Sequence, residues 1–530
     1  MSSTALPSTQ IACRGKSIQC LLFALLATGL IFFWQGDKGL NLPDEGFFWY
    51  GVQRVFAGEV PILDFMSYDP GRYYWSVGLM KLFGSESLLM LRATGALLQG
   101  LGVFVALRIL SDGATGPRPA LLLLAAATLT AWMYPWFKVF DIVTSIALIT
   151  AMIALLRRPS YRRYFGFGVI VGFAAVFGRH HGVYGLAGSI GVIVFLAIRP
   201  EVGTTLPQRL LAWSAGIALG FLPILIAAAL VPGFALAFWQ SVVFLYSEVK
   251  TTNLPLPVPW PWVVDTTVMS RVDAAAAVTQ GWTFVAMIAF AVLTPLWVFV
   301  QRIRGKQVSA VIVACGMLAL PYAHYSFSRA DTVHLALGIF PLLIGAFACL
   351  LNSRAWFRVP AAIALCAASV TIMLPLDPGW QCHLAGNCTK AEVGGSKILV
   401  TEPTARDLAL IHALGEKAGL NGNVLFTPFW PGAYAVLNRR SPMWEIYGLF
   451  SRSEAFEQAE ISRIRAAAPE MVLINNAPLD SREDLRFQNT HPLIYRYIIE
   501  NFEPVKEYTR EPVSLVYRRK ATVPARAEAP

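Results

Sequence analysis

The chain has 530 residues, of which 56% are hydrophobic and only 14% are charged. A soluble protein has about 25% charged residues, so this composition excludes a purely soluble fold. The net charge of +11 does not indicate a nucleic-acid partner, because residues 377–530 contain 18 basic and 18 acidic residues and the whole excess lies before them. A basic excess confined to the apolar part is typical of the cytoplasmic loops of a membrane protein.

The N-terminal region contains the first apolar run. Residues 1–17 are polar, and an apolar stretch extends from Ile18 to Trp34. No small-residue cleavage pattern follows, so we interpret the stretch as an uncleaved first span that begins in the cytoplasm.

Residues 1–376 contain a series of further apolar runs. A run of about 20 residues crosses a bilayer as a helix, because its backbone polar groups must bond within the segment. Basic residues gather in short segments that alternate with longer, less basic ones. We therefore predict about eleven spans, with the N-terminus in the cytoplasm and the C-terminus outside. The clearest runs after the first are 120–131, 142–156, 190–198, 210–230, 282–300, 308–320, 335–350 and 361–374.

Two of the predicted outer loops are long, and they comprise residues 37–86 and 232–278. Four prolines prevent a continuous helix in the second of these loops. The tryptophans between them suit a membrane interface. Two interpretations stay open: an interfacial anchor, or a flexible cover over a site. The residues concerned are Pro255, Pro257, Pro259, Pro261, Trp260 and Trp262.

The character of the sequence changes after Leu376. In residues 377–530, predicted helices at 405–418, 453–467 and 492–501 alternate with short apolar strands. The strands are expected at 423–427, 471–474, 504–508 and 513–517. The fold class is therefore mainly α: a polytopic membrane helix bundle in residues 1–376, with a C-terminal extracytoplasmic α/β domain in residues 377–530.

Two of the seven cysteines differ from the others. Cys382 and Cys388 flank a short polar loop just after the last apolar run. A disulfide is expected if this loop is exported. A zinc site that includes His383 is the alternative.

The first outer loop opens with two adjacent carboxylates, Asp44 and Glu45. A carboxylate at a membrane surface can act as a general base. Adjacent side chains diverge, so only one of the two is expected to point into a given site. The alternative is that Asp44 caps the helix that follows Pro43, and from the residues alone this structural role is favoured.

A second acidic position follows in the same loop, at Asp69. The stretch Asp69-Pro70-Gly71-Arg72 is expected to form a turn. Its role is either structural or functional. In the functional interpretation it places an acid and a guanidinium opposite Asp44, with Arg72 binding a phosphate.

Ionisable residues also gather where the predicted spans meet the outer face. Such residues are costly in lipid and usually face a cavity or pair with one another. We predict that the cationic ones bind a lipid-linked phosphate, although Arg329–Asp331 and Lys138–Asp141 are also plausible simple ion pairs. Adjacent histidines lack the spacing of a helical zinc site, so no metal site is assigned, and a divalent metal cofactor is left open. The residues are Arg92, Lys138, Asp141, Arg179, His180, His181, Arg329, Asp331 and His334.

The first outer loop resembles the GT-C glycosyltransferases, in particular the bacterial lipid A aminoarabinose transferases and the protein O-mannosyltransferases. The resemblance rests on the Asp44-Glu45 pair, on Gly58-Glu59-Val60-Pro61 and on the stretch Tyr68-Asp69-Pro70-Gly71-Arg72-Tyr73-Tyr74-Trp75. The aminoarabinose transferases carry Glu-Lys-Pro-Pro where this chain has Tyr68-Asp69-Pro70-Gly71. The lysine is therefore missing, and the resemblance leaves the sugar open.

The resemblance implies a function at the bacterial cytoplasmic (inner) membrane. Such an enzyme transfers a sugar from a polyprenyl-phosphate donor to a lipid or cell-envelope polysaccharide acceptor on the periplasmic face. It further implies that Asp44 is the base or the acid that positions the acceptor. A transporter or flippase of a lipid-linked saccharide is the alternative, for which the ionisable residues should line a path through the bilayer.

Overall fold

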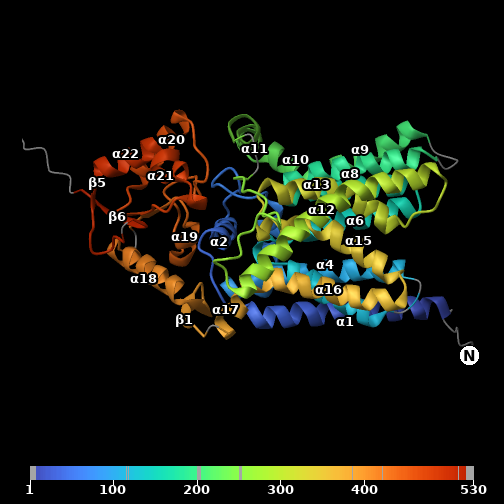
Figure 1. Ribbon diagram of the computed structural model, residues 1–530. Coiled ribbons are helices and arrows are strands. Elements are labelled where there is room, and N and C mark those ends of the chain that lie inside the picture. Colours follow the sequence, from blue (N-terminus) through green and yellow to red (C-terminus); the bar gives the residue numbers. More distant parts are fainter. Residues whose placement is uncertain are drawn as a thin grey trace, which may run out of the picture. The chain divides into compact units, whose positions relative to one another are not determined.

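The computed structural model describes residues 8–114, 116, 118–199, 205–249, 253–384, 386–419, 422–510 and 512–520. The chain forms two compact units (Figure 1). The first, here called the helical unit, comprises Met1–Asp37 and Leu89–Gly386, and the second, the mixed unit, comprises Lys38–Leu88 and Asn387–Pro530. The first outer loop thus packs with the C-terminal residues, whereas the sequence analysis grouped it with the membrane helices.

The helical unit consists of apolar helices joined by short connections (Figure 1). Leu88, the first residue of α4, belongs to the mixed unit, and the rest of that helix belongs to this unit. The helices are α1 (Ser8–Gln35), α4 (Leu88–Gly113), α5 (Pro119–Trp132), α6 (Val139–Arg157), α7 (Tyr161–Phe177), α8 (Arg179–Ala197), α9 (Leu206–Gly220), α10 (Leu222–Leu230), α11 (Phe234–Val243), α12 (Arg271–Ile303), α13 (Ala310–Ser328), α14 (Thr332–Gly338), α15 (Phe340–Leu351), α16 (Ala355–Met373) and α17 (Pro378–Leu384). Three short helical turns accompany them: η1 (Trp136–Lys138), η2 (Phe244–Val249) and η3 (Leu374–Leu376).

The eleven spans expected from the sequence are not confirmed. Among the described residues, 7 helices are long and apolar enough to cross a membrane, or up to 9 if each of two bent pairs counts as one span. The bent pairs are α9 with α10 and α14 with α15, with bends of 52° and 57°. The run predicted near residues 120–131 corresponds to α5, which is only 14 residues long and falls short of a full span.

Glycines allow helices α7 and α9 of this unit to pack closely against each other. Gly168 and Gly172 of α7 face Gly216 and Gly220 of α9, and a Cβ on any of the four would collide with backbone atoms of the opposite helix. The four-residue spacing places each pair on one helix face. Small residues at this spacing let two helix backbones approach closely in lipid, where packing rather than the hydrophobic effect drives association.

Helix α13 lies at the centre of the unit and packs against α6, α8, α12, α14 and α15. Its last turn, which ends at Ser328, therefore meets the first turns of α6 and α8. This arrangement gathers polar residues at one end of the helices.

The second long loop is partly helical. It contains α11 and the π-helical turn η2, and the stretch 253–270 has no helix before α12 begins at Arg271. The four prolines and two tryptophans lie in this non-helical stretch, where Trp260 stacks on Trp262 at 5.5 Å between ring centroids.

The mixed unit combines helices with two small sheets. Strands β1 (Cys388–Val393) and β2 (Ser396–Thr401) form an antiparallel hairpin that the sequence analysis missed. The second sheet has the order β3-β4-β6-β5, with β3 (Val424–Thr427) parallel to β4 (Met471–Asn475). Strand β6 (Ser514–Arg519) pairs antiparallel with both β4 and β5 (Phe502–Pro504).

The helices of the mixed unit come from both parts of the chain. They are α2 (Asp44–Phe56), α3 (Gly71–Phe83), α18 (Glu402–Lys417), α19 (Pro431–Leu437), α20 (Glu454–Ala467), α21 (Phe487–Thr490) and α22 (Pro492–Asn501), with the short turns η4 (Leu479–Ser481) and η5 (Glu483–Leu485). The three helices predicted for the C-terminal region are all present, so its α/β character is confirmed.

Candidate functional site

The start of α2 carries the two carboxylates singled out in the sequence. Asp44 is the first residue of the helix, and its carboxylate makes no hydrogen bond or ion pair with any residue that the structure describes. Its backbone N–H is instead bonded to the side-chain oxygen of Asn41 at 2.7 Å. The backbone N–H of Asn41 donates to Glu45 Oε2 at 3.1 Å.

The two flanking residues therefore carry out the capping role that was the structural alternative for Asp44. The Asn41 side chain accepts the N–H of Asp44, and the Glu45 carboxylate accepts the N–H of Asn41, an arrangement that resembles a capping box. Glu45 is buried, and its carboxylate is used for this purpose. Asp44 is half-buried, and it is the member of the pair whose carboxylate is available for chemistry.

The second acidic position, Asp69, lies just before α3. Pro70 precedes the helix, and the guanidinium of Arg72 lies over the ring of Tyr68 at 4.9 Å. Asp69 and Arg72 are both buried. The ring of Tyr68 also meets Phe47 of α2 edge-on at 4.8 Å, so the predicted turn and the start of α2 form one packed group.

Helix α2 is fixed to the C-terminal part of the mixed unit at close range. Gly46 lies against the backbone of Gly432 in α19, and a Cβ at position 46 would collide with it. The N–H of Gly432 donates to the carbonyl of Leu42 at 2.9 Å. On the next turns, Gln53 Nε2 donates to the carbonyl of Ala435 at 3.1 Å, so the helix that carries Asp44 has a defined position within its unit.

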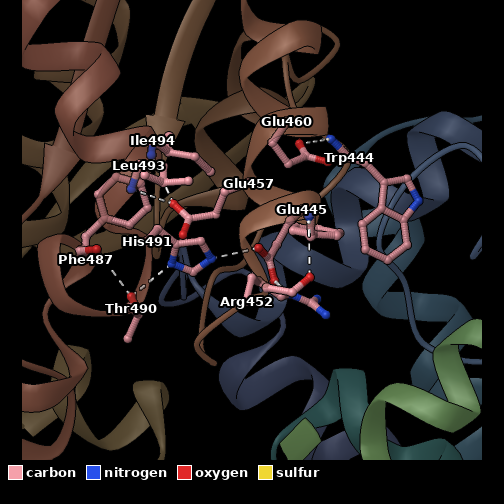
Figure 2. Close-up of polar contacts among 12 residues, drawn as sticks. Trp444, Glu445, Arg452, Glu457, Glu460, Phe487, Thr490, His491, Leu493 and Ile494 are labelled. Atoms are coloured by element: carbon pink, nitrogen blue, oxygen red, sulfur yellow. Dashed lines mark hydrogen bonds and ion pairs between the residues drawn. The ribbon is translucent and has the colours of Figure 1, made fainter.

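The mixed unit also contains a buried ionic network (Figure 2). Glu445 binds Arg452 at 2.6 Å and His491 at 2.8 Å, and His491 also contacts the hydroxyl of Thr490 at 2.9 Å. The residue before Glu445, Trp444, accepts the N–H of Met66 at 2.9 Å through its carbonyl. The network thus holds the loop between α19 and α20 against the first outer segment.

Two further buried glutamates complete this region (Figure 2). Glu457 accepts the N–H groups of Leu493 and Ile494 and so satisfies the first turn of α22. Glu460 accepts the N–H of Trp444 at 2.9 Å and pairs with Arg463. Burial raises the pKa of Glu460, and the nearby charge of Glu445 adds to this effect.

In the helical unit, Asp141 meets both adjacent histidines. Asp141 lies in the first turn of α6, and its Oδ1 is 2.7 Å from His181 Nε2 and 3.3 Å from His180 Nε2. The other ring nitrogen of His181 contacts the hydroxyl of Tyr322 at 2.9 Å. Asp141, His181 and Tyr322 are fully buried. Two imidazoles and a carboxylate are a donor set that can hold a metal ion.

A second polar group lies beside the first. Asp331 caps α14 by accepting the N–H of His334, and it also contacts the His334 ring and Arg329, at 2.8 Å and 2.9 Å. Burial alone would raise the pKa of Asp331, but the hydrogen bonds and charge of His334 and the charge of Arg329 lower this pKa to about 2. Asp331 is therefore a carboxylate, and the Arg329–Asp331 ion pair considered for the sequence is present.

Tyr325 joins the two polar groups. Its ring centroid is 4.8 Å from that of His180 and 5.9 Å from that of His334. The charge of Lys138 acts on His334, and the Lys138 side chain makes no hydrogen bond or ion pair within the described part of the chain. The structure thus brings together most of the helical unit's predicted site residues: Lys138, Asp141, His180, His181, Arg329, Asp331 and His334.

Two predicted phosphate ligands have other contacts. Arg92 is buried, and its guanidinium donates to the carbonyl of Gly36 at 2.9 Å, just beyond the C-terminal end of α1. Arg179 donates to the hydroxyl of Ser241 in α11 at 2.6 Å and lies over the ring of Phe238 at 5.0 Å.

Several residues at these sites escaped the sequence analysis. Tyr322 and Tyr325 are three residues apart in α13 and therefore share one helix face, a spacing that could have drawn attention to them. Asn41 lies three residues before the first helical residue, outside the usual cap position, which Pro43 occupies. Glu445 and His491 are 46 residues apart, and no local pattern connects them. Cys382 and Cys388, for which a disulfide was expected, are both disulfide-bonded.

Comparisons with known proteins give matches at the level of structure. No family model matches the chain, and no curated protein matches its sequence. ArnT from Cupriavidus metallidurans, bound to undecaprenyl phosphate, is 14% identical with a TM-score of 0.49, over 94% of this chain and 98% of that one. The Archaeoglobus fulgidus oligosaccharyltransferase, tethered with an acceptor peptide, is 11% identical with a TM-score of 0.46, over 96% of this chain and 74% of that one.

Another structure of the archaeal enzyme, named AglB and in complex with an inhibitory peptide and a dolichol-phosphate, covers 98% of this chain at a TM-score of 0.45. The similarity to these two proteins covers nearly the whole length of the chain.

Proposed function

We propose that this protein is a membrane glycosyltransferase. It transfers a sugar from a polyprenyl-phosphate donor to a lipid or cell-envelope polysaccharide acceptor on the periplasmic face of a bacterial inner membrane. The apolar helices place the chain in a bilayer, and the first outer loop carries the motifs that resemble the GT-C transferases.

The state of Asp44 is the observation that carries this proposal. A carboxylate at the start of a helix usually serves as a cap, but here Asn41 and Glu45 close the helix and leave the Asp44 carboxylate without a hydrogen bond among the described residues. A half-buried acid on a firmly held helix is suited to act as a general base.

In the proposed reaction, the Asp44 carboxylate accepts the proton of the acceptor hydroxyl. The acceptor oxygen forms the new bond to the anomeric carbon of the sugar, while the bond from that carbon to the phosphate oxygen breaks. The polyprenyl phosphate leaves with the electron pair. Cationic groups stabilise the charge that develops on this phosphate.

The membrane orientation is part of the same proposal. With the N-terminus in the cytoplasm, α1 delivers residues 38–88 to the periplasm. Residues 387–530 lie on that side as well, because they pack in one unit with residues 38–88. The mixed unit as a whole is then periplasmic, which is the side where polyprenyl-linked sugars serve cell-envelope acceptors.

The proposal is tested by measuring sugar transfer by the purified full-length protein. The protein in lipid nanodiscs is incubated with a panel of synthetic polyprenyl-phosphate sugars and with cell-envelope lipids, and the products are identified by mass. A product heavier than the acceptor by one sugar residue supports the proposal. Movement of the lipid-linked sugar across vesicles without any product would instead identify a flippase and refute the transferase assignment.

A further inference from the structure

Three metal-binding side chains converge in the helical unit. Asp141 comes from the first turn of α6, and His180 and His181 come from the first turn of α8. One ligand atom from each lies within 4.8 Å of the other two. Sequence spacing alone argued against a metal here, because adjacent histidines do not share a helix face. In the folded chain, both rings nevertheless face the same carboxylate oxygen.

We propose that Asp141, His180 and His181 bind a divalent transition-metal ion, with zinc as the ion that fits best. Two imidazole nitrogens and one carboxylate oxygen are the ligand types that zinc accepts, and a site with three protein ligands keeps a fourth position for water or substrate. Magnesium and calcium prefer all-oxygen sites, so this nitrogen-rich set disfavours them.

The distances between ligand atoms are consistent with such an ion. Zinc lies about 2.0–2.2 Å from nitrogen and oxygen ligands, so two ligands of a tetrahedral site are about 3.3–3.5 Å apart. Asp141 Oδ1 is 3.3 Å from His180 Nε2 and 2.7 Å from His181 Nε2. The separation between Asp141 and His180 already matches this value. The separation between Asp141 and His181 must increase by less than about 1 Å to admit the ion.

The surroundings of His181 orient it as a ligand. Its Nδ1 contacts the Tyr322 hydroxyl at 2.9 Å, and both side chains are fully buried. Histidine ligands usually donate their second ring N–H to an oxygen, which fixes the ring and the tautomer. With Nδ1–H donated to Tyr322, the lone pair of Nε2 points to the side where Asp141 lies.

His180 supplies the observation that a simple hydrogen-bonded pair does not explain. Its Nε2 atom is buried and has no hydrogen-bond partner among the described residues, although it lies 3.3 Å from Asp141 Oδ1. A buried polar atom without a partner is rare and calls for an unseen ligand or ion. A metal ion between the three side chains would satisfy this nitrogen. The side chain is 25% exposed, which provides a path for the ion.

The test measures metal binding and is independent of any transferase activity. The full-length, tag-free protein is purified in nanodiscs, stripped with a chelator, reloaded with zinc and desalted, and its metal content is determined by mass spectrometry. We expect one zinc per chain. Cobalt in place of zinc should give the intense visible absorption of a tetrahedral site with nitrogen and oxygen ligands.

Two variants and one control connect the ion to these residues. His180→Asn and Asp141→Asn should each lose the stoichiometric zinc and the cobalt spectrum. His324→Asn is the matched control, because this exposed histidine contacts Tyr184 at 3.2 Å and is not one of the three ligands. Tyr322→Phe should keep the site but weaken its affinity by about 10–100-fold, since it removes the partner of a ligand.

Two results would overturn the proposal. One is a wild-type protein that retains no stoichiometric zinc after reloading. The other is a His180→Asn variant that remains monodisperse and binds zinc as tightly as the wild type, which would place the ion elsewhere. Because the measurement is metal content, a failure of the proposed glycosyl transfer would not affect either result.

Discussion

The side-chain oxygen of Asn41 accepts the backbone N–H of Asp44 at 2.7 Å. This single hydrogen bond separates two roles that the sequence alone assigned to one residue. Asn41 closes the helix, and Asp44 keeps its carboxylate for another purpose. The two residues can therefore be tested against each other.

Asp44→Asn is expected to remove transfer activity without loss of folded protein. The amide cannot accept the proton of the acceptor, and general-base catalysis typically contributes about 100-fold to 10,000-fold in rate. The measurement is the turnover of the donor, compared at equal amounts of monodisperse protein. Full activity in this variant would exclude Asp44 from the chemistry.

Asn41→Ala should show the opposite pattern. It removes the side chain that caps α2, and the loss of such a cap costs about 0.5–2 kcal/mol of stability. We expect a lower thermal unfolding midpoint with much of the transfer activity retained. If Asn41→Ala abolished turnover while the midpoint stayed unchanged, the assignment of Asn41 as a structural cap would be wrong.

Gly46→Ala should destabilise the mixed unit, because its Cβ would meet the backbone of Gly432, which no side-chain rotation can relieve. Overpacking of this kind costs about 1–3 kcal/mol. Gly78→Ala in α3 is the matched control: a Cβ there meets nothing within 4 Å, and alanine favours a helix by about 1 kcal/mol over glycine. Thermal unfolding of the two full-length variants should shift in opposite directions.

Arg452→Met should be among the most damaging changes outside the membrane helices. It leaves Glu445 buried without its arginine, and the removal of one partner of a buried ion pair costs about 3–5 kcal/mol. Arg406→Met is the control, because it breaks an ion pair with Glu402 in which both side chains are exposed. Such a surface pair contributes about 0–1 kcal/mol to stability. Equal unfolding midpoints for the two variants would show that the buried network is not structural.

Glu460 should make stability depend on pH. Burial raises its pKa above the ordinary 4.5. The folded state therefore holds the proton more tightly than the unfolded state, and this contribution to stability is present at low pH and lost as the pH rises through the raised pKa. Glu460→Gln removes the titrating group, so the wild-type advantage over the variant should shrink as the pH increases. A constant difference across the series would contradict a raised pKa.

Lys138→Gln tests the cationic groups of the helical unit. A hydrogen bond to a charged group is worth about 1.5–3 kcal/mol, so we expect kcat/KM for the donor to fall by about 10-fold to 150-fold. The exposed Lys306 gives the control variant Lys306→Gln, which should behave as the wild type. Unchanged donor kinetics in Lys138→Gln would remove this residue from the phosphate-binding set.

The sequence by itself determined the membrane class, the three main helices and most of the larger sheet of the C-terminal region, but not its β1–β2 hairpin, and it located most of the side chains that matter. These properties depend on composition, apolar runs and local propensity, which are readable from neighbouring residues. Local patterns also located Asp44, Asp141, the histidine pair and Asp331. They could not assign partners to these residues, because a partner can lie far away in the chain.

Only the tertiary structure decided those partners. It grouped residues 38–88 with 387–530, brought His181 to Asp141 and Tyr322, and used Arg92 to bind the carbonyl of Gly36. The physical reason is that packing and buried hydrogen bonds act between atoms that are close in space. His181 and Tyr322 are 141 positions apart in the chain, and no local sequence pattern indicates that contact.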